Sequence, residues 1–562
     1  MALQFISGNS ISDRTAVMYE TICAQSCRHP DKNYIFLVPE QATLQVQREL
    51  SAVHPNHVLG NIDVVSFGRL AHRLLNEQAG KQAVLLDDTG KSMILRRIAG
   101  KEKQSLEVFG RNLNQSGFIQ ELKSVISEFS AYKVTSEVLE GVLPTLEKRP
   151  ALQKKLRDIE KVYTSFYKEL GEEYLTAEEL LGVLSRLVSQ SEKIRTSIII
   201  LDGFTGFTPL QYQVLEEMLQ CAEHVVCAVT EDEKGGREEL FSMSREMKNK
   251  LLTLAKAHHV SCEEKNHRYV TKKRKVAEEL AHLEKQLYKV PPKSWNKQTD
   301  AVNIIAAKNP SEELSFVLRK VLSLVREGYA YREIAVVGDL SVYRDEISHV
   351  FDQAGISYFI DQKKGLNTHP LIQFVKKALA VLEEQMSYDS VMAFLRNPYV
   401  VSDENTFDGD ILCEDLDRLD NYLLAGGIER INRWKHPWVM PYDNADEEDL
   451  LRLNQLREQI FNWFVPLRTV WEKPDTTVRE AMTALFSFMQ QFNIAYKLKA
   501  QQKAFRESGE KYLASEYEQV YAKVLGLFDQ IVELMGDETL EVRVLSDILD
   551  SGFEELSVGF IP

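Results

Sequence analysis

An α/β fold made of parallel sheets with helices on both faces is the fold class that this sequence predicts. The main observation is a series of short apolar runs, each ending in small or polar residues and followed by a helical pattern. Runs rich in Val, Ile and Leu that alternate with helices are typical of strands buried on both faces of a parallel sheet. Because ligands of such sheets bind beyond the carboxyl ends of the strands, functional residues are expected just after each run. The runs of the first half are Leu3–Ser7, Tyr34–Val38, Ile62–Ser66, Ser197–Leu201 and Val225–Val229.

The composition is that of an ordinary globular protein. Of 562 residues, 44% are apolar and 27% are charged, which excludes disordered and collagen-like classes. No apolar run approaches the roughly 20 residues that span a bilayer, and the start has no signal-peptide pattern. Six scattered cysteines fit reduced thiols, so we expect a cytoplasmic protein with no membrane contact. The net charge of −15 argues mildly against a DNA-coating protein but leaves room for a local basic channel.

A long helical stretch interrupts the first set of strands. Segments such as SGFIQELKSVISEFSAY repeat apolar residues at helical spacing. We interpret residues 85–190 as an all-helical insertion into a first domain, which is formed by residues 1–84 and 191–295.

A second α/β unit repeats this plan. The chain after it is mostly helical and then stops on an apolar, strand-like run, SVGFIP. We therefore predict a second, truncated domain formed by residues 296–385 and 546–562, with an all-helical insertion at 386–545, and interpret the chain as part of a longer protein. The strands and helices expected in this unit are 302–307 (VNIIAA), Ser311–Glu327, Ile334–Val337, Val342–Gln353 and Ile356–Ile360.

The end of the first strand has the spacing of a P-loop, G-x-x-x-x-G-K-[ST], between a strand and a helix. A working P-loop wraps phosphates with backbone amides, and needs a lysine at the β/γ-phosphates and a hydroxyl on Mg²⁺. Gly8 and Thr15 keep their roles, but Asp13 replaces the second glycine and Arg14 replaces the lysine. The alternative is an ordinary strand–turn–helix in which Ser12 or Asp13 caps the helix.

A second nucleotide signature follows the run Ser197–Leu201. Asp202 stands where a Walker B carboxylate holds Mg²⁺, but Gly203 stands where a hydrolysing helicase has a glutamate that positions water. Asp202 could equally cap a turn. Both signatures stand where RecA-like domains (P-loop NTPase type) carry them. We therefore predict two RecA-like parallel-sheet domains, each with a large helical insertion, and a degenerate nucleotide site.

Several long runs resemble the AddB family, the B subunits of bacterial AddAB ATP-dependent helicase/deoxyribonucleases. The resemblance spans the whole chain in the expected order, and the family is related to superfamily 1 helicases. The runs that carry it are LVPEQATLQVQREL (37–50), VVSFGRLAHRLL (64–75), LDGFTGFTPLQYQVLEEM (201–218), IAVVGDLSVYRDEISHVFDQAGISYFID (334–361) and the final LSDILDSGFEELSVGFIP.

The resemblance implies a role in processing double-strand break ends for recombinational repair. It implies a heterodimer in which an AddA-type helicase–nuclease supplies translocation. The AddB chain, similar to RecC, guides the 3′-ended DNA strand and scans it for the Chi sequence. Family members carry a nuclease domain with an iron–sulfur cluster and Mg²⁺ in a C-terminal region that the runs above do not reach. We therefore expect no cofactor in this chain, and Asp13 and Arg14 argue against bound ATP and Mg²⁺.

The resemblance places contacts to the DNA strand on the loops after the second, third and fourth strands. Phe and His can stack on unpaired bases, Gln and Thr can contact base edges, and Arg can hold a phosphate or a guanine. The candidates are Gln41, Thr43, Phe67, Arg69, His72 and Phe207.

Some of these candidates also have a purely structural explanation. Phe67 follows a buried strand and is typical of a core residue. Arg69 could pair with Glu40 or Glu49, and Gln41 could cap the following helix.

Three functions are consistent with these observations. The first is a DNA-binding, Chi-scanning subunit without ATPase activity. The second is a functional superfamily 1 ATPase with an unorthodox P-loop, against which Asp13, Arg14 and Gly203 argue. The third is a pure protein scaffold, against which the polar and aromatic residues after the strands argue.

Overall fold

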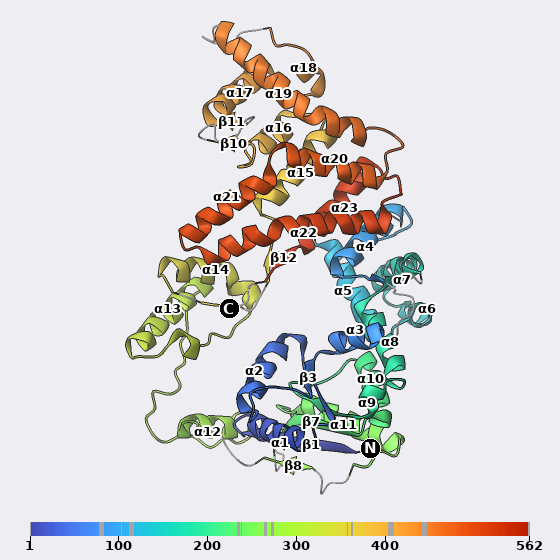
Figure 1. Ribbon diagram of the computed structural model, residues 1–562, viewed down its shortest axis with the longest axis vertical. Helices are drawn as coiled ribbons and strands as arrows, with labels where there is room; N and C mark the ends of the chain where they lie inside the picture. Colours follow the sequence, from blue (N-terminus) through green and yellow to red (C-terminus); the bar gives the residue numbers. More distant parts are fainter. Residues whose placement is uncertain are drawn as a thin grey trace. The chain divides into compact units, whose positions relative to one another are not determined.

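The structure is a computed structural model in which the chain forms two compact units, each described by itself below (Figure 1). Unit 1 comprises residues 1–86, 124–150 and 170–305, and unit 2 comprises 87–123, 151–169 and 306–562. The residues that the structure describes are 2–77, 84–102, 104–111, 117–171, 174–232, 237, 239–262, 267–270, 275–356, 358–360, 363–402, 410–439 and 447–559.

Unit 1 contains a six-stranded parallel sheet with the strand order β3-β2-β6-β7-β1-β8. The five strands that the sequence predicts in this half are confirmed to within one residue at each end, whereas β8 was not predicted. The register pairs Leu3 with Val225 and Tyr34 with Ile198. The strands are β1 (Leu3–Gly8), β2 (Asn33–Leu37), β3 (Ile62–Val65), β6 (Ser197–Leu201), β7 (His224–Thr230) and β8 (Arg268–Tyr269).

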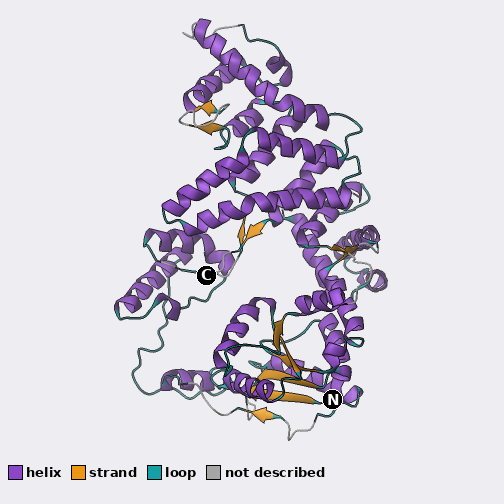
Figure 2. Ribbon diagram, in the orientation of Figure 1, coloured by secondary structure: helices purple, strands orange, loops and turns teal. Residues whose placement is uncertain are grey.

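Helices cover both faces of this sheet (Figure 2). Successive side chains of a strand point to opposite faces, so each strand contributes apolar residues to both layers of helices. Leu3 and Phe5 of β1 belong to the hydrophobic cluster with α3 (Phe67–Glu77), α8 (Ala177–Val188), α10 (Pro209–Cys221) and α11 (Ser242–Ala257). Ile6 belongs to the cluster with α1 (Arg14–Arg28) and α2 (Thr43–Val53). The continuous apolar runs of the sequence are therefore explained by a sheet buried on both faces.

Short elements complete unit 1. The described residues of the stretch 85–190 are mainly helical, and the short strands β4 and β5 pair in parallel. Thr176 starts α8 with a capping box, in which its hydroxyl accepts from the Glu179 amide and the Glu179 carboxylate accepts from the Thr176 amide. These elements are η1 (Glu40–Ala42), β4 (Val84–Leu85), α6 (Ser136–Val142), η3 (Leu143–Leu146), β5 (Tyr174–Leu175), α9 (Glu192–Arg195) and α12 (Glu278–Gln286).

The described residues of unit 2 are mainly helical, as the sequence predicts for residues 386–545, and they include the short parallel pair of β10 and β11. Its core is aromatic: Phe374, Phe394, Phe488 and Phe492 have ring centroids 5.1–5.9 Å apart, and Trp434 is fully buried. The core elements are α15 (Pro370–Glu383), α16 (Tyr388–Leu395), β10 (Val401–Ser402), β11 (Ile411–Leu412), α17 (Cys413–Gly426), α18 (Ile431–Lys435), α19 (Glu447–Trp471), α20 (Val478–Gln491), α21 (Ile494–Glu507), α22 (Lys511–Met535) and α23 (Val542–Glu555).

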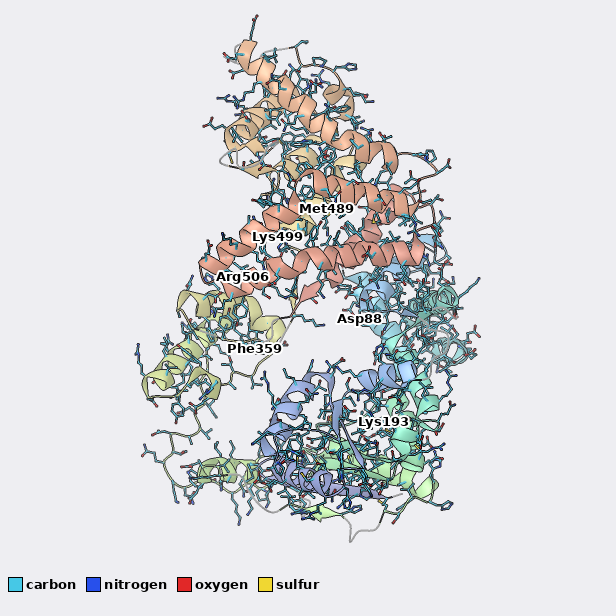
Figure 3. The ribbon with its side chains drawn as sticks, viewed as in Figure 1. Asp88, Lys193, Phe359, Met489, Lys499 and Arg506 are labelled. Carbon is cyan, nitrogen blue, oxygen red and sulfur yellow. The ribbon has the colours of Figure 1, made fainter. Side chains whose placement is uncertain are left out.

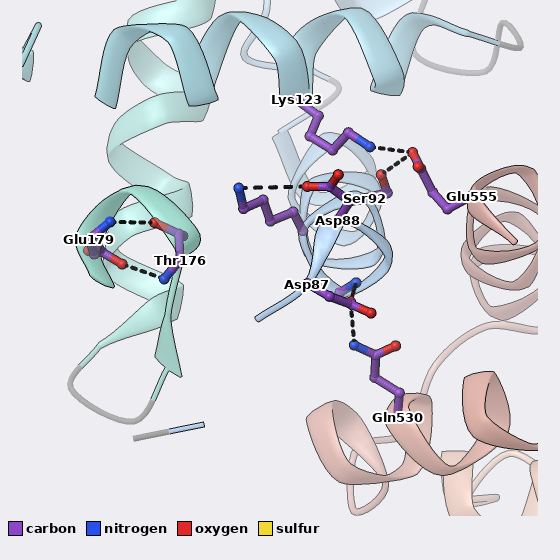
Figure 4. A network of polar contacts seen from close by, with 10 residues as sticks. Asp87, Asp88, Ser92, Lys123, Thr176, Glu179, Gln530 and Glu555 are labelled. Atoms are coloured by element: carbon purple, nitrogen blue, oxygen red, sulfur yellow. Dashed lines mark hydrogen bonds and ion pairs between the residues drawn. The ribbon is translucent and has the colours of Figure 1, made fainter. Parts of the chain in front are cut away.

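Part of the first helical stretch packs within unit 2, where α4 (Asp88–Glu102) lies against α23. Glu555 accepts hydrogen bonds from Lys123 Nζ at 2.6 Å and from Ser92 Oγ at 2.9 Å (Figure 4). Gln530 Nε2 donates to Asp87 Oδ1 at 2.7 Å. These bonds join segments more than 400 residues apart in the sequence, which no local pattern predicts. Unit 2 also includes η2 (Phe109–Arg111), while α5 (Phe118–Ala131) and α7 (Pro150–Leu170) contribute residues to both units.

The second parallel sheet that the sequence predicts is not formed by the described residues. Runs 302–307, 334–337 and 356–360 make no strand there, and Ile304 and Val337 are 95% and 96% exposed. The reason is that an apolar run becomes a strand only where a neighbour accepts and donates its backbone hydrogen bonds. The helices between the runs do form, as α13 (Pro310–Arg326) and α14 (Leu340–Gln353), with η5 (Tyr331–Glu333) between them.

The last apolar run pairs elsewhere. Ser557–Val558 forms β12, antiparallel to β9 (Lys364–Gly365), while residues 560–562 lie outside the described part of the chain. Among the described residues no helix is long and apolar enough to cross a membrane.

His369 is a buried titratable residue at the start of α15. It is 3% exposed and caps α15, where its Nδ1 accepts from the Leu371 amide at 3.1 Å. Its ring centroid lies 4.6 Å from that of Tyr517. Burial, reinforced by the charge of Lys364, lowers the pKa of His369 to about 4.

We predict that the free energy of unfolding falls as the pH drops from about 6.5, the ordinary histidine pKa, toward 4. In that window the unfolded chain binds a proton that the folded chain does not, which costs at most about 1.4 kcal/mol per pH unit. His369→Asn keeps a capping side chain without this titration and should flatten the dependence. Urea unfolding at pH 7 and 5 measures this, and an unchanged slope in the variant would contradict the assignment.

Candidate functional site

The candidate site lies at the carboxyl edge of the unit 1 sheet. Because the strands are parallel, the residues that follow β1, β2, β3, β6 and β7 meet at this one edge. Here lie both the nucleotide signatures and the loops that were predicted to contact DNA.

The P-loop position after β1 is a tight turn. The Ser12 amide and hydroxyl both donate to the Asn9 carbonyl oxygen, at 3.0 and 2.8 Å. A Cβ on Gly8 would lie 2.2 Å from Ser12 Oγ, so only glycine fits here. Asp13 takes the N-cap position of α1 without a capping side-chain bond. The loop therefore closes on itself and leaves no wide cradle of amides for phosphates.

Arg14, at the lysine position, is held by the neighbouring strand. Its Nη1 donates to Thr230 Oγ1, at the end of β7, at 2.8 Å. The side chain is half-buried, as is that of Thr15. The two residues after Thr230 are used structurally, because Glu231 pairs with Lys248 at 2.5 Å and Asp232 binds Arg237.

Asp202, at the metal position, is buried with both oxygens engaged. Tyr19 Oη donates to Oδ2 at 2.9 Å, and the Gly203 amide donates to Oδ1 at 3.0 Å. Burial raises the pKa of Asp202 above its ordinary value, against the opposing effects of Tyr19 and Arg14. Burial and the charge of Asp202 also raise the pKa of Tyr19, so its hydroxyl stays a donor.

Gly203 has a structural reason to be glycine. Its φ is +79°, in the left-handed region, and a Cβ would lie 3.2 Å from Pro39 Cδ. A glutamate that positions water could not be placed here without strain. Taken together, the closed turn, the tethered Arg14 and the engaged Asp202 do not fit a Mg²⁺–nucleotide.

The predicted DNA-contacting residues divide into an exposed and a buried set. Gln41, on η1, and Arg69 and His72, on one face of α3, are exposed. Thr43 is buried and its hydroxyl donates to the Glu40 carbonyl oxygen. Phe67 is also buried. Phe67 belongs to the hydrophobic cluster with α8 and α10, and Thr43 bonds back to the turn before α2, so burial keeps both side chains from the surface.

An aromatic cluster joins the loops after β3 and β6. The Phe67 ring packs edge-on against Phe204 and Phe207, with centroids 5.9 and 6.1 Å away. Phe207 is half-buried and also contacts Tyr212 at 5.5 Å. Phe67 thus supports Phe207 from within, and Phe207 keeps part of its ring at the surface.

The structural roles considered for Arg69 and Gln41 find no support in the described part of the chain. No ion pair joins Arg69 to Glu40 or Glu49 there. Gln41 makes no capping bond to α2, whose N-cap is Ala42. Arg69 is anchored through its backbone, since its amide donates to Ser66 Oγ at 3.3 Å.

Comparison with known proteins identifies the family. A model of the family described as ADDB, N-terminal, matches residues 5–284, and one described as UvrD-like helicase C-terminal domain matches residues 264–549. The chain belongs to the AddB family. The resemblance drawn from the sequence runs is thereby confirmed.

Relatives match over the whole of this chain. It is 34% identical over 578 residues to the B subunit of the ATP-dependent helicase/deoxyribonuclease of Lachnoclostridium phytofermentans. The proteins of the same name from Acetivibrio thermocellus and Clostridium tetani are 32% and 31% identical. Each alignment covers 100% of this chain and 50% of the relative, so the chain spans about half the length of the curated relatives it matches.

Sequence reasoning missed Tyr19 and Thr230, the two residues that hold Asp202 and Arg14. Both partnerships join residues far apart in the sequence, 183 and 216 positions, which motif spacing along the chain does not reveal. It also missed Glu216, whose carboxylate lies 2.6 Å from His258 Nε2. Among the described residues no cluster of three or more His, Cys, Asp or Glu side chains has an arrangement that could bind a metal ion.

We predict that Gly203→Glu destabilises the protein by about 1–3 kcal/mol, the usual cost of a side chain in a strained backbone conformation. Gly206→Glu is the matched control, since a Cβ there has no heavy atom within 4 Å. It should change the stability by less than about 0.5 kcal/mol. Thermal unfolding compares the two, and equal effects would show that the Gly203 backbone can relax.

Proposed function

We propose that this AddB-family chain holds and reads a DNA strand without acting as a motor. In this proposal it guides the 3′-ended strand and scans it for the Chi sequence during the processing of double-strand breaks for recombinational repair. One observation carries the proposal. At the same sheet edge, the residues at nucleotide positions bond to groups of the fold itself, while polar and cationic residues of the adjacent loops face solvent.

The absence of motor activity is supported by what each nucleotide-site group already does. ATP hydrolysis needs amides around the phosphates, a carboxylate for Mg²⁺ and a base that orients water. Here the Ser12 amide donates to the Asn9 carbonyl oxygen, and the Asp202 carboxylate accepts from the Tyr19 hydroxyl. The position of the water-orienting base is occupied by Gly203. Binding a nucleotide would have to break bonds that the fold already makes.

DNA contact is supported by the chemistry of the exposed residues. Arg69 and His72 lie three residues apart on α3, so they share one helix face. An exposed guanidinium can bind a phosphate or a guanine edge, and an imidazole can stack on an unpaired base. Gln41 and the exposed part of Phe207 add a base-edge contact and a second stacking surface. In this proposal Thr43 and Phe67 support the loops and do not touch DNA.

The relatives are named as one subunit of a helicase/deoxyribonuclease, which supports the existence of a partner chain. We propose an AddA-type partner that supplies ATP hydrolysis and translocation in a cytoplasmic heterodimer. Nuclease chemistry, with any Mg²⁺ or iron–sulfur cluster, belongs in this proposal to the partner and to the half of the relatives that this chain does not match.

We predict no saturable binding of Mg²⁺–ATP by the purified chain up to about 1 mM, which corresponds to a binding free energy weaker than about −4 kcal/mol. Isothermal titration calorimetry measures this, with a turnover assay beside it. Micromolar binding with turnover that Asp202→Asn abolishes would instead establish a functional ATPase.

We predict that Arg69→Ala weakens binding of single-stranded DNA by about five- to tenfold, and His72→Ala by a similar factor through lost stacking. Arg73→Ala is the matched control, because Arg73 lies on the same helix but pairs with Asp63. Fluorescence anisotropy with labelled oligonucleotides measures the effect. Equal affinities for all three variants would favour a pure protein scaffold or a different DNA surface.

A further inference from the structure

A second, unassigned surface lies on α21 in unit 2. Its exposed residues Tyr496, Lys499, Lys503 and Arg506 are spaced by three, four and three residues. At 3.6 residues per turn this spacing places all four on one face of the helix. We call these four residues the α21 stripe. Lys499 and Arg506 are labelled along α21 in Figure 3.

The opposite face of α21 packs against unit 2. Ile494 and Leu498 are buried there. Lys497 is buried as well, and it donates to Asp410 Oδ1 at 2.6 Å and to the Tyr399 carbonyl oxygen at 2.8 Å. This cation is used within the core, so the cations of the stripe are a separate set that the fold does not need for packing.

The α21 stripe is cationic, whereas the chain as a whole is acidic. The chain has 83 acidic residues among 562, yet residues 481–506 contain none, while they include four lysines and arginines. The whole chain carries a net charge of −15. A cationic surface on an acidic protein favours a polyanionic partner, because the attraction is local and screened beyond about 10 Å.

The ion pairs within the stripe are weak. Arg506 pairs with Glu518 at 2.9 Å and Lys503 with Glu507 at 3.8 Å, and all four side chains are 55–78% exposed. Exposed pairs of this kind contribute little to stability, so a phosphate can replace the carboxylate at small cost. Tyr496 is 66% exposed and adds a ring on which a base can stack.

We propose that the α21 stripe binds the phosphate backbone of single-stranded DNA independently of base sequence. The proposal rests on the DNA-holding function proposed above, and adds a second contact surface in the other unit. Lys499 and Arg506 are separated by about 10 Å along the helix, at 1.5 Å per residue, which allows the three cations to engage successive phosphates. Tyr496, at one end of the stripe, can stack on a base. An acidic protein surface offers no base, so this residue favours single-stranded DNA as the partner.

The test is the triple variant Lys499→Gln, Lys503→Gln, Arg506→Gln in the full chain, with binding measured for oligo-dT and for a mixed-sequence oligonucleotide of equal length. We expect about tenfold weaker binding of both at low salt. The slope of log K against log salt should become shallower by up to about 2, at roughly 0.7 per lost phosphate contact. Tyr496→Ser should weaken binding about fivefold or more with no change in this slope.

The matched control is Arg319→Gln, Lys320→Gln, Arg326→Gln, which removes the same charge from exposed positions of α13. Equal losses in the two triple variants would overturn the proposal, because they would reflect net charge alone.

Unchanged DNA binding by the α21 variant, while Arg69→Ala weakens it, would overturn this inference and leave the proposed function standing. An α21 variant that loses only its affinity for an AddA-type partner would overturn it too, and would assign the stripe to a protein. A chain that binds no DNA would overturn both proposals.

Discussion

The parallel pairing of β6 between β2 and β7 is the constraint on which the rest of unit 1 depends. It brings the carboxyl ends of distant segments to one edge, where the chain changes from strand to loop. Asp202 thereby meets Tyr19, and Gly203 approaches Pro39 so closely that a Cβ would lie 3.2 Å from Pro39 Cδ. A shift of the register by one residue would turn every strand side chain to the other face and undo both contacts.

The parallel pairing of β6 also explains why the residues at both nucleotide positions, Asp202 and Arg14, bond to neighbouring parts of the fold. A buried carboxylate is costly unless its oxygens are hydrogen-bonded. Asp202 meets this demand through Tyr19 and the Gly203 amide. Arg14, which the fold places beside the end of β7, is likewise bonded to Thr230. The groups at the two nucleotide positions thus join elements of the fold to one another.

The proposed DNA contacts follow from what remains exposed once these bonds are made. In unit 1 the aromatic cluster around Phe67 fixes the loops after β3 and β6, and leaves Arg69 and His72 on the outer face of α3. In unit 2 the buried pair of Lys497 and Asp410 fixes α21, and leaves its other cations outward. In both units a buried anchor determines which charged side chains are available to a partner.

The sequence by itself determined five of the six strands of the unit 1 sheet, the helices α13 and α14, the family and the altered residues Asp13, Arg14 and Gly203. Those features are local: apolar runs, helical periodicity and motif spacing are readable without knowing what lies nearby. Only the tertiary structure decided that runs 302–307 and 334–337 stay unpaired and exposed, because a strand needs a neighbour. It also decided that Thr43 and Phe67 are buried, and that Asp202 and Arg14 are bonded to residues 183 and 216 positions away. Such partnerships depend on which strand ends meet in space, and spacing along the chain does not encode them.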